Sequence, residues 1–250
     1  MTGTALLMSL PVFITFQNGG VNSGYADVPL AYLCVGFVSS LFHWLCNGGA
    51  ARLAIAMLFG VFLIFTKQEG LALWVLTLAC IFPFTLTSGR RSIFKLRSLF
   101  IICLGTGVLL YPWFDYRSHL PSIDEDYFSR LSVESFSAGS ARLLFVFQSF
   151  LKEILLKPHL WNVLGPLLLV TLFLSPLRTL WLKHSLFFWI PQSYCLLICL
   201  VFLISPWKIE ELVPVSLTRL LIHVAPLIIL WLFFQMETIN LLPQAWTRSD

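Results

Sequence analysis

The sequence predicts an all-α protein, a polytopic transmembrane bundle of about seven or eight hydrophobic helices with one interfacial amphipathic helix. Composition is the first reason: 58% of the 250 residues are apolar and 11% are charged, against about a quarter charged in a soluble domain. The second is a series of long hydrophobic runs without the two-residue alternation of barrel strands, which leaves helices to satisfy the backbone in lipid. We therefore expect residues 1–250 to form a single transmembrane domain.

The hydrophobic runs can be compared with the ~20 residues that cross a hydrocarbon core. In chain order they are 4–16, 28–46, 53–66, 70–87, 98–114, 160–176, 185–204 and 217–235. Most are long enough to qualify as spans. The first run is short, and no basic residue precedes it, so we interpret it as the stump of a longer helix rather than as a secretory signal.

Residues 141–157 differ from these runs because polar and apolar side chains gather on opposite helical faces. The polar face carries Arg142, Gln148, Ser149, Lys152, Glu153 and Lys157, and the apolar face carries Leu143, Phe147, Phe150, Leu151 and Ile154. This pattern favours a helix that lies in the membrane interface, within an outer-face segment at 115–159. The alternative, a helix that crosses, would move the basic loop at 177–184 to the outer side, against the charge rule.

Basic residues in short loops set the orientation. The loop at 88–97 holds four basic residues and no acid, which places it in the cytoplasm together with the loops at 47–52 and 177–184. Ten of the twelve carboxylates then lie outside, and both termini lie inside. We expect a bacterial inner (plasma) membrane protein whose net charge of +4 reflects topology, with no nucleic acid as partner.

A polar island at 24–29 (GYADVP) interrupts the apolar chain on the outer side. Asp27 comes just before Pro29 at the start of a predicted helix, where the helix dipole favours an ionised carboxylate. Such a group can take a proton from a hydroxyl or an amine, or help to hold a divalent cation. The alternative is that Asp27 only caps its helix.

A second island at 66–70 (TKQEG) lies on the same predicted side. The run before it, 53–66, would make a helix of roughly 21 Å against a core of about 30 Å, so we expect Lys67 and Glu69 to lie below the outer surface. A sunken Lys suits a phosphate, and a Glu beside it could orient a substrate hydroxyl. The alternative is a turn whose two charges neutralise each other.

A third polar position opens the last span. Arg219 enters it from the outside, and His223 lies one turn deeper on the same helical face. An Arg at this depth can recognise the phosphate of a lipid headgroup. The alternatives are an Arg that snorkels to the interface and a His that serves packing alone.

These motifs together resemble the GT-C glycosyltransferases, and more narrowly the bacterial branch related to protein O-mannosyltransferases and to the aminoarabinose transferase of lipid A. The resemblance lies in the motifs at 24–31, 66–71, 111–113 and 218–223, in this order and on one predicted side. It implies an enzyme that moves a sugar from a polyprenyl-phosphate carrier to a glycan, lipid or protein acceptor on the outer face of the membrane.

The resemblance also implies roles for residues. Asp27 would be the catalytic acidic residue of an outer loop, helping to position the acceptor or a metal. The residues that would bind the donor are Tyr25, Lys67, Glu69, Arg219 and His223. The identity of a bound metal stays open, and a divalent cation is one candidate cofactor.

The chain departs from the family pattern ahead of Asp27. Only 26 residues precede it, whereas family members begin with further helices and a first outer loop that carries the principal catalytic carboxylate. We therefore expect a partial or reduced homologue with little activity by itself. Two other classes stay open, a transporter or flippase for a lipid-linked sugar and a non-catalytic membrane scaffold.

Overall fold

The computed structural model describes residues 10–14, 20, 25–86, 92–119, 140–175 and 183–238. Within these ranges every regular element is a helix, which confirms the predicted all-α class. The elements are η1 (Pro11–Phe13), α2 (Asp27–Asn47), α3 (Ala50–Thr66), α4 (Gln68–Leu86), α5 (Ser92–Ser118), η4 (Ser140–Arg142), α7 (Leu143–Leu156), α8 (Pro158–Trp161), α9 (Leu164–Leu174), η6 (Lys183–Ser185), α10 (Leu186–Ile204), α11 (Ile209–Ile222) and α12 (Ala225–Thr238).

Within the described ranges, four or five helices have the length and composition to cross a membrane. Four described helices, α2, α4, α5 and α10, are long and apolar enough, and α11 with α12 makes a fifth if this bent pair is one span. α3 has 17 residues and α9 has 11, which makes both short for the ~20 residues of a full crossing. The predicted run at 4–16 lies mostly outside the described residues. The described residues thus include the apolar helices of an integral membrane protein, with four or five candidate spans, and the expected count of seven or eight is not confirmed.

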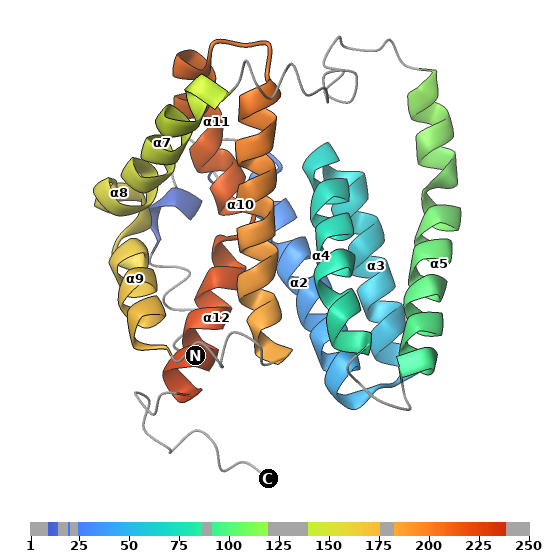
Figure 1. Cartoon of the computed structure of the whole chain (residues 1–250). Coiled ribbons are helices and arrows are strands. Elements are labelled where there is room, and N and C mark those ends of the chain that lie inside the picture. Colours follow the sequence, from blue (N-terminus) through green and yellow to red (C-terminus); the bar gives the residue numbers. More distant parts are fainter. Residues whose placement is uncertain are drawn as a thin grey trace.

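The helices run up and down between two ends of one bundle (Figure 1). We call the end at the α10–α11 connection the upper end and the end at the α2–α3 turn the lower end. Gly48 and Gly49 make the α2–α3 turn with φ of 69° and 99°, values that L side chains rarely adopt. The α3–α4 turn and the end of α5 point upward, whereas the starts of α5 and α10 lie at the lower end. The described helix ends that border the loops at 47–52, 88–97 and 177–184 therefore lie at the same end of the bundle.

Helix α7 covers most of the stretch for which the sequence predicts an interfacial helix, and that location stays a prediction. It packs beside α11 and α10, and α8 and α9 continue its path to the lower end, where α9 packs on α12 (Figure 1). α7 and α9 thus accompany the bent pair α11–α12 over the height of the bundle. On its polar face Glu153 is buried, whereas Leu143 and Phe147 of its apolar face are more than half exposed. An apolar exterior around buried polar groups is what lipid surroundings favour.

The core is centred on α2, which contacts α3, α4, α11 and α12. Phe37 and Leu41 of α2, Phe187 of α10 and Trp231 of α12 are all fully or almost fully buried. Because α2 is the central helix, the Asp27, Val28 and Leu30 side chains at its start face the inside of the bundle. This placement puts Asp27 among helices from both halves of the chain.

Candidate functional site

Asp27 is completely buried although it is the first residue of α2. Its Oδ1 accepts hydrogen bonds from Lys67 Nζ at 2.6 Å and His223 Nε2 at 2.9 Å, and its Oδ2 accepts one from Arg219 Nε at 3.0 Å. The residue before it, Ala26, is the N-cap, and no side chain caps the helix. The capping alternative for Asp27 therefore does not describe this carboxylate, which binds side chains of other elements.

Lys67 reaches Asp27 from the turn between α3 and α4. Its extended backbone, φ −163° and ψ 156°, ends α3 and lets α4 begin at the next residue. Lys67 Nζ also lies 3.1 Å from Glu69 Oε1, so the predicted neutralising pair exists but is shared with Asp27. In Figure 1 the upper tips of α3 and α4 lie well below those of α5 and α10, and the depth of this island in a membrane stays a prediction.

Arg219 and His223 come from the last turn of α11 and the bend that follows it. The axes of α11 and α12 differ by 51°. Pro226 lies in the first turn of α12, and a proline there removes a backbone donor and crowds the carbonyl of residue 222, which accounts for the bend. The guanidinium carbon of Arg219 lies 4.0 Å from the ring centroid of Tyr25, a cation–π contact.

His223 is fully buried and links Asp27 to a further residue, Tyr194 of α10, whose Oη lies 2.8 Å from His223 Nδ1. An ionised carboxylate only accepts hydrogen bonds, so Nε2 carries the proton toward Asp27. In a neutral imidazole Nδ1 then accepts from the Tyr194 hydroxyl. The alternatives of a snorkelling Arg219 and of a His223 that serves packing alone do not describe these contacts. Arg219 pairs with a buried acid, and His223 has a polar partner on each side.

We define the charged cluster as Tyr25, Asp27, Lys67, Glu69, Tyr194, Arg219 and His223. Asp27 and His223 form its closed floor, with side chains at 0% exposure. Lys67, Glu69 and Arg219 form a rim, with 23%, 33% and 24% of their side chains exposed. With a neutral imidazole the two cations balance the two carboxylates. The structure thus brings together every residue that the sequence singled out for the site, and their roles stay predictions.

The geometry limits what each group of the charged cluster can do. Both oxygens of Asp27 are held by donors and none of its side chain is exposed, so Asp27 organises the cations in this state. Arg219 uses Nε on Asp27, and its two terminal nitrogens have no hydrogen-bond partner among the described residues. An anion that reaches the rim can therefore meet Arg219 and Lys67 together.

Two features of the polar interior were missed by the sequence interpretation. Tyr194 lies in the middle of an apolar run, where nothing in the sequence separates it from a packing aromatic. Glu153 of α7 is 3% exposed and accepts hydrogen bonds from Thr218, Trp161 and Lys157, although its helical face was expected to be solvated. The spacing of four residues between Glu153 and Lys157 was the available signal for a buried carboxylate. An acid that is paired with a cation tolerates burial.

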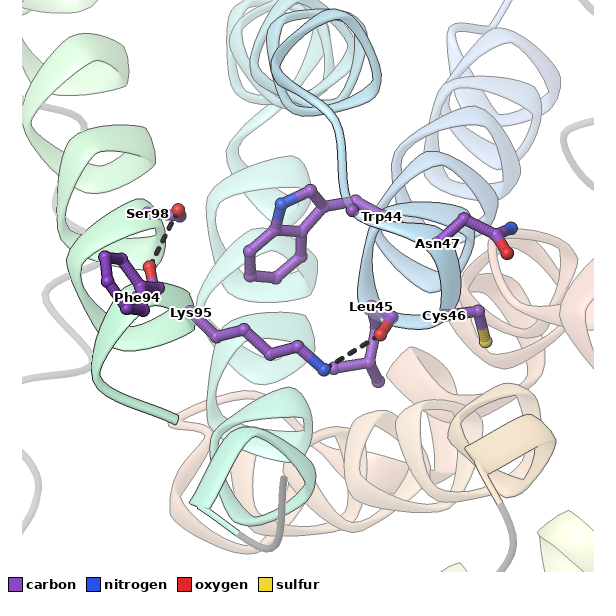
Figure 2. A pocket seen from close by; sticks show the side chains of 8 residues that line it. Trp44, Leu45, Cys46, Asn47, Phe94, Lys95 and Ser98 are labelled. Carbon is purple, nitrogen blue, oxygen red and sulfur yellow. Dashed lines mark hydrogen bonds between the residues drawn. The ribbon is translucent and has the colours of Figure 1, made fainter. Parts of the chain in front are cut away.

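A cavity of about 370 Å³ opens at the opposite, lower end (Figure 2). It lies between the end of α2 and the start of α5, and Lys95 Nζ donates to the carbonyl oxygen of Leu45 at 3.0 Å beside it. Its lining consists of Trp44, Leu45, Cys46, Asn47, Gly48, Phe94, Lys95 and Ser98. None of these belongs to the charged cluster, so this cavity is separate from the candidate site.

Metal ligands were considered because the sequence left a divalent cation open. In the described ranges no group of three or more His, Cys, Asp or Glu side chains is arranged to hold a metal ion. We therefore derive no step through a metal. The acidic stretch at 124–126 and much of the expected outer-face segment at 115–159 lie outside the described residues.

No protein-family model, no curated protein and no solved structure matches this chain. Its function therefore has to be argued from the charged cluster and the helices that hold it.

Proposed function

We propose that the charged cluster binds the phosphate of a polyprenyl-phosphate-linked sugar, and that the chain acts as part of a GT-C-type glycosyltransferase on the outer face of the membrane. The observation that carries this proposal is the meeting of Lys67 and Arg219 at one buried carboxylate, with about a quarter of each cation exposed. An ionisable group among apolar helices is energetically costly, so its presence points to a substrate or ion site.

A phosphate fits this pair of cations chemically. Lys offers a compact point charge, and the guanidinium of Arg offers parallel donors that match two phosphate oxygens. The terminal nitrogens of Arg219 have no partner within the described residues, so they can bind before Nε leaves Asp27. The sunken α3–α4 turn suits a phosphate that a lipid carries at headgroup depth, with the polyprenyl chain in the bilayer.

Phosphate binding also allows Asp27 to act as a general base. When Lys67 and Arg219 turn toward the phosphate, lone pairs of the Asp27 carboxylate become free to accept the proton of an acceptor hydroxyl. The acceptor oxygen would then bond to the sugar carbon while the bond from that carbon to the phosphate oxygen breaks. The carrier phosphate leaves with its charge held by the two cations. The acceptor can be a glycan, a lipid or a protein.

Binding of polyprenyl monophosphate to the purified protein in nanodiscs tests the proposal. Lys67→Gln and Arg219→Gln each remove one cation, and we expect either change to weaken binding by about tenfold or more. Arg52→Gln is the matched control, because Arg52 also donates to an oxygen, the carbonyl of Gly48, but at the lower end. Equal affinity in all four proteins would contradict the proposal.

One observation favours a second candidate, a flippase or transporter for the same lipid-linked sugar. The charged cluster lies at the bend between α11 and α12, and broken helices with charges at the break are typical of transporter sites. The two functions separate in vesicles that contain the chain with its lipid-linked sugar donor and a soluble acceptor. Appearance of a glycosylated acceptor supports the transferase, and movement of intact donor between leaflets without transfer supports the transporter.

A further inference from the structure

Glu153 is a second buried carboxylate, and the proposed chemistry does not use it. Its side chain is 4% exposed. Oε1 accepts hydrogen bonds from Thr218 Oγ1 at 2.6 Å and from Trp161 Nε1 at 3.2 Å, and Oε2 accepts one from Lys157 Nζ at 2.6 Å. One carboxylate thus joins three elements, because its donors lie on α8, on α11 and at the end of α7.

The contact on α11 lies directly beside the charged cluster. Thr218 precedes Arg219, and successive helical residues point about 100° apart around the axis. Thr218 therefore faces α7 while Arg219 and His223 face Asp27. Threonines inside helices commonly bond their own backbone, but the Thr218 hydroxyl donates to Glu153 on a neighbouring helix.

These contacts hold α11 at two points of its circumference. Asp27 holds it through Arg219 and His223, and Glu153 holds it through Thr218. Two anchors in different directions fix the rotation of a helix about its own axis, whereas one anchor leaves that rotation to side-chain packing alone. The bend after Ile222 makes this restraint important, because α12 does not continue the axis of α11.

We propose that Glu153 is a positioning residue for Arg219: through Thr218 it fixes the rotation of α11 and so sets how well Arg219 binds a carrier phosphate. The effect on phosphate binding rests on the proposed function. The restraint on Arg219 does not, because it concerns the contact between Arg219 and Asp27. Loss of the acceptor at position 153 lets α11 turn and weakens that contact.

The affinity for polyprenyl monophosphate in nanodiscs measures the first part. Glu153→Ala and Thr218→Val should each weaken binding by about five- to tenfold, because each removes the hydrogen bond that orients α11. Glu153→Gln keeps an oxygen that can accept from Thr218 and Trp161, so it should restore affinity to within about twofold. Thr77→Val is the matched control, since Thr77 is also buried but donates to Leu73 of its own helix.

A double-mutant cycle measures the restraint of Glu153 on Arg219 without any ligand, from the free energies of unfolding of the variants. If Glu153 acts through Arg219, the loss of stability caused by Arg219→Ala should be smaller in a Glu153→Ala protein than in the unaltered protein. Additive effects would overturn the proposal, and so would a Glu153→Gln protein that binds as weakly as Glu153→Ala. A chain that shows the coupling but binds no polyprenyl phosphate would refute the proposed function and leave the positioning role supported.

Discussion

Asp27 holds three side chains from two distant parts of the sequence, and its own side chain has no contact with solvent. Such a carboxylate is balanced by its neighbours rather than by water. Lys67 and Arg219 are each partly exposed, so part of their charge stays solvated. The stability of the charged cluster therefore depends more on the negative charge of Asp27 than on the shape of its side chain.

Asp27→Asn keeps the shape and removes the charge. We expect it to lower the free energy of unfolding by about 2 kcal/mol, because two cations then lie beside a neutral amide. Insertion into the membrane should not change, since the apolar helices stay intact, whereas sugar transfer by the enzyme of which the chain is proposed to be part should fall strongly. Unfolding in a detergent series measures the stability. Asp115→Asn is the control, because Asp115 is exposed on α5 and should change nothing.

The sequence identified the charged residues of the site, but it did not identify the buried polar residues next to them. Asp27, Lys67 and Arg219 stood out because charge in an apolar chain is rare, and topology then placed them at one end. Tyr194 could not be found in this way, since its hydroxyl matters only through the three-dimensional contact with His223. Glu153 was assigned to the polar face of an interfacial helix, because the pattern of one helix does not show the contacts with Thr218 and Trp161.

At the scale of elements, two local features place the charged cluster. The α3–α4 turn sets the position of Lys67, and the α11–α12 bend sets the positions of Arg219 and His223. The sequence indicated the turn through its polar residues. It did not indicate the bend, because 217–235 was interpreted as one run although Pro226 lies within it.

Gly70 determines how closely α4 can approach α3. A Cβ at position 70 would collide with the backbone carbonyl of Leu63, which cannot move as a flexible side chain does. We expect Gly70→Ala to cost about 1–3 kcal/mol of stability and to displace Lys67. Gly107→Ala is the matched control: no atom lies within 4 Å of its added Cβ, so the change should be neutral or slightly stabilising. Equal unfolding midpoints for the two variants would contradict this explanation.

Pro226 tests the role of the bend. Alanine at this position restores a backbone donor, so α11 and α12 should straighten from their angle of 51°. Spin labels at the exposed positions Glu210 and Glu237 should then report a longer distance by pulsed electron resonance. Polyprenyl phosphate binding should fall in the same variant, because Arg219 and His223 leave Asp27. An unchanged distance would mean that packing rather than the proline sets the bend.

For the whole molecule, the two ends of the bundle differ in character. The lower end carries the α2–α3 turn and the start of α5 with its basic residues, and the charged cluster lies toward the upper part. The apolar composition indicated the class of protein, whereas the described residues contain four or five candidate spans and do not confirm a count of seven or eight. Helices shorter than a full crossing, such as α9, have hydrophobic runs that resemble complete spans until their ends and packing are seen.

Orientation can be tested by thiol labelling of single-cysteine proteins in cells. Cys46 is exposed near the lower end, and a Lys208→Cys variant places a thiol at an exposed upper position. If the basic loops are cytoplasmic, a membrane-impermeant reagent should label position 208 in intact cells and Cys46 only after permeabilisation. The reverse pattern would place the charged cluster on the cytoplasmic side and remove the outer-face donor from the proposal.

The most direct test of the central claim is photocrosslinking with a polyprenyl phosphate that carries a photoreactive group next to its phosphate. Peptide mapping should find the label near Tyr25, Lys67 and Arg219, and excess unmodified carrier should abolish it. Lys67→Gln should reduce the labelling at all three places. Label spread over the exposed face of α5, for example at Phe100 and Leu104, and not reduced by carrier would contradict a phosphate site at the charged cluster.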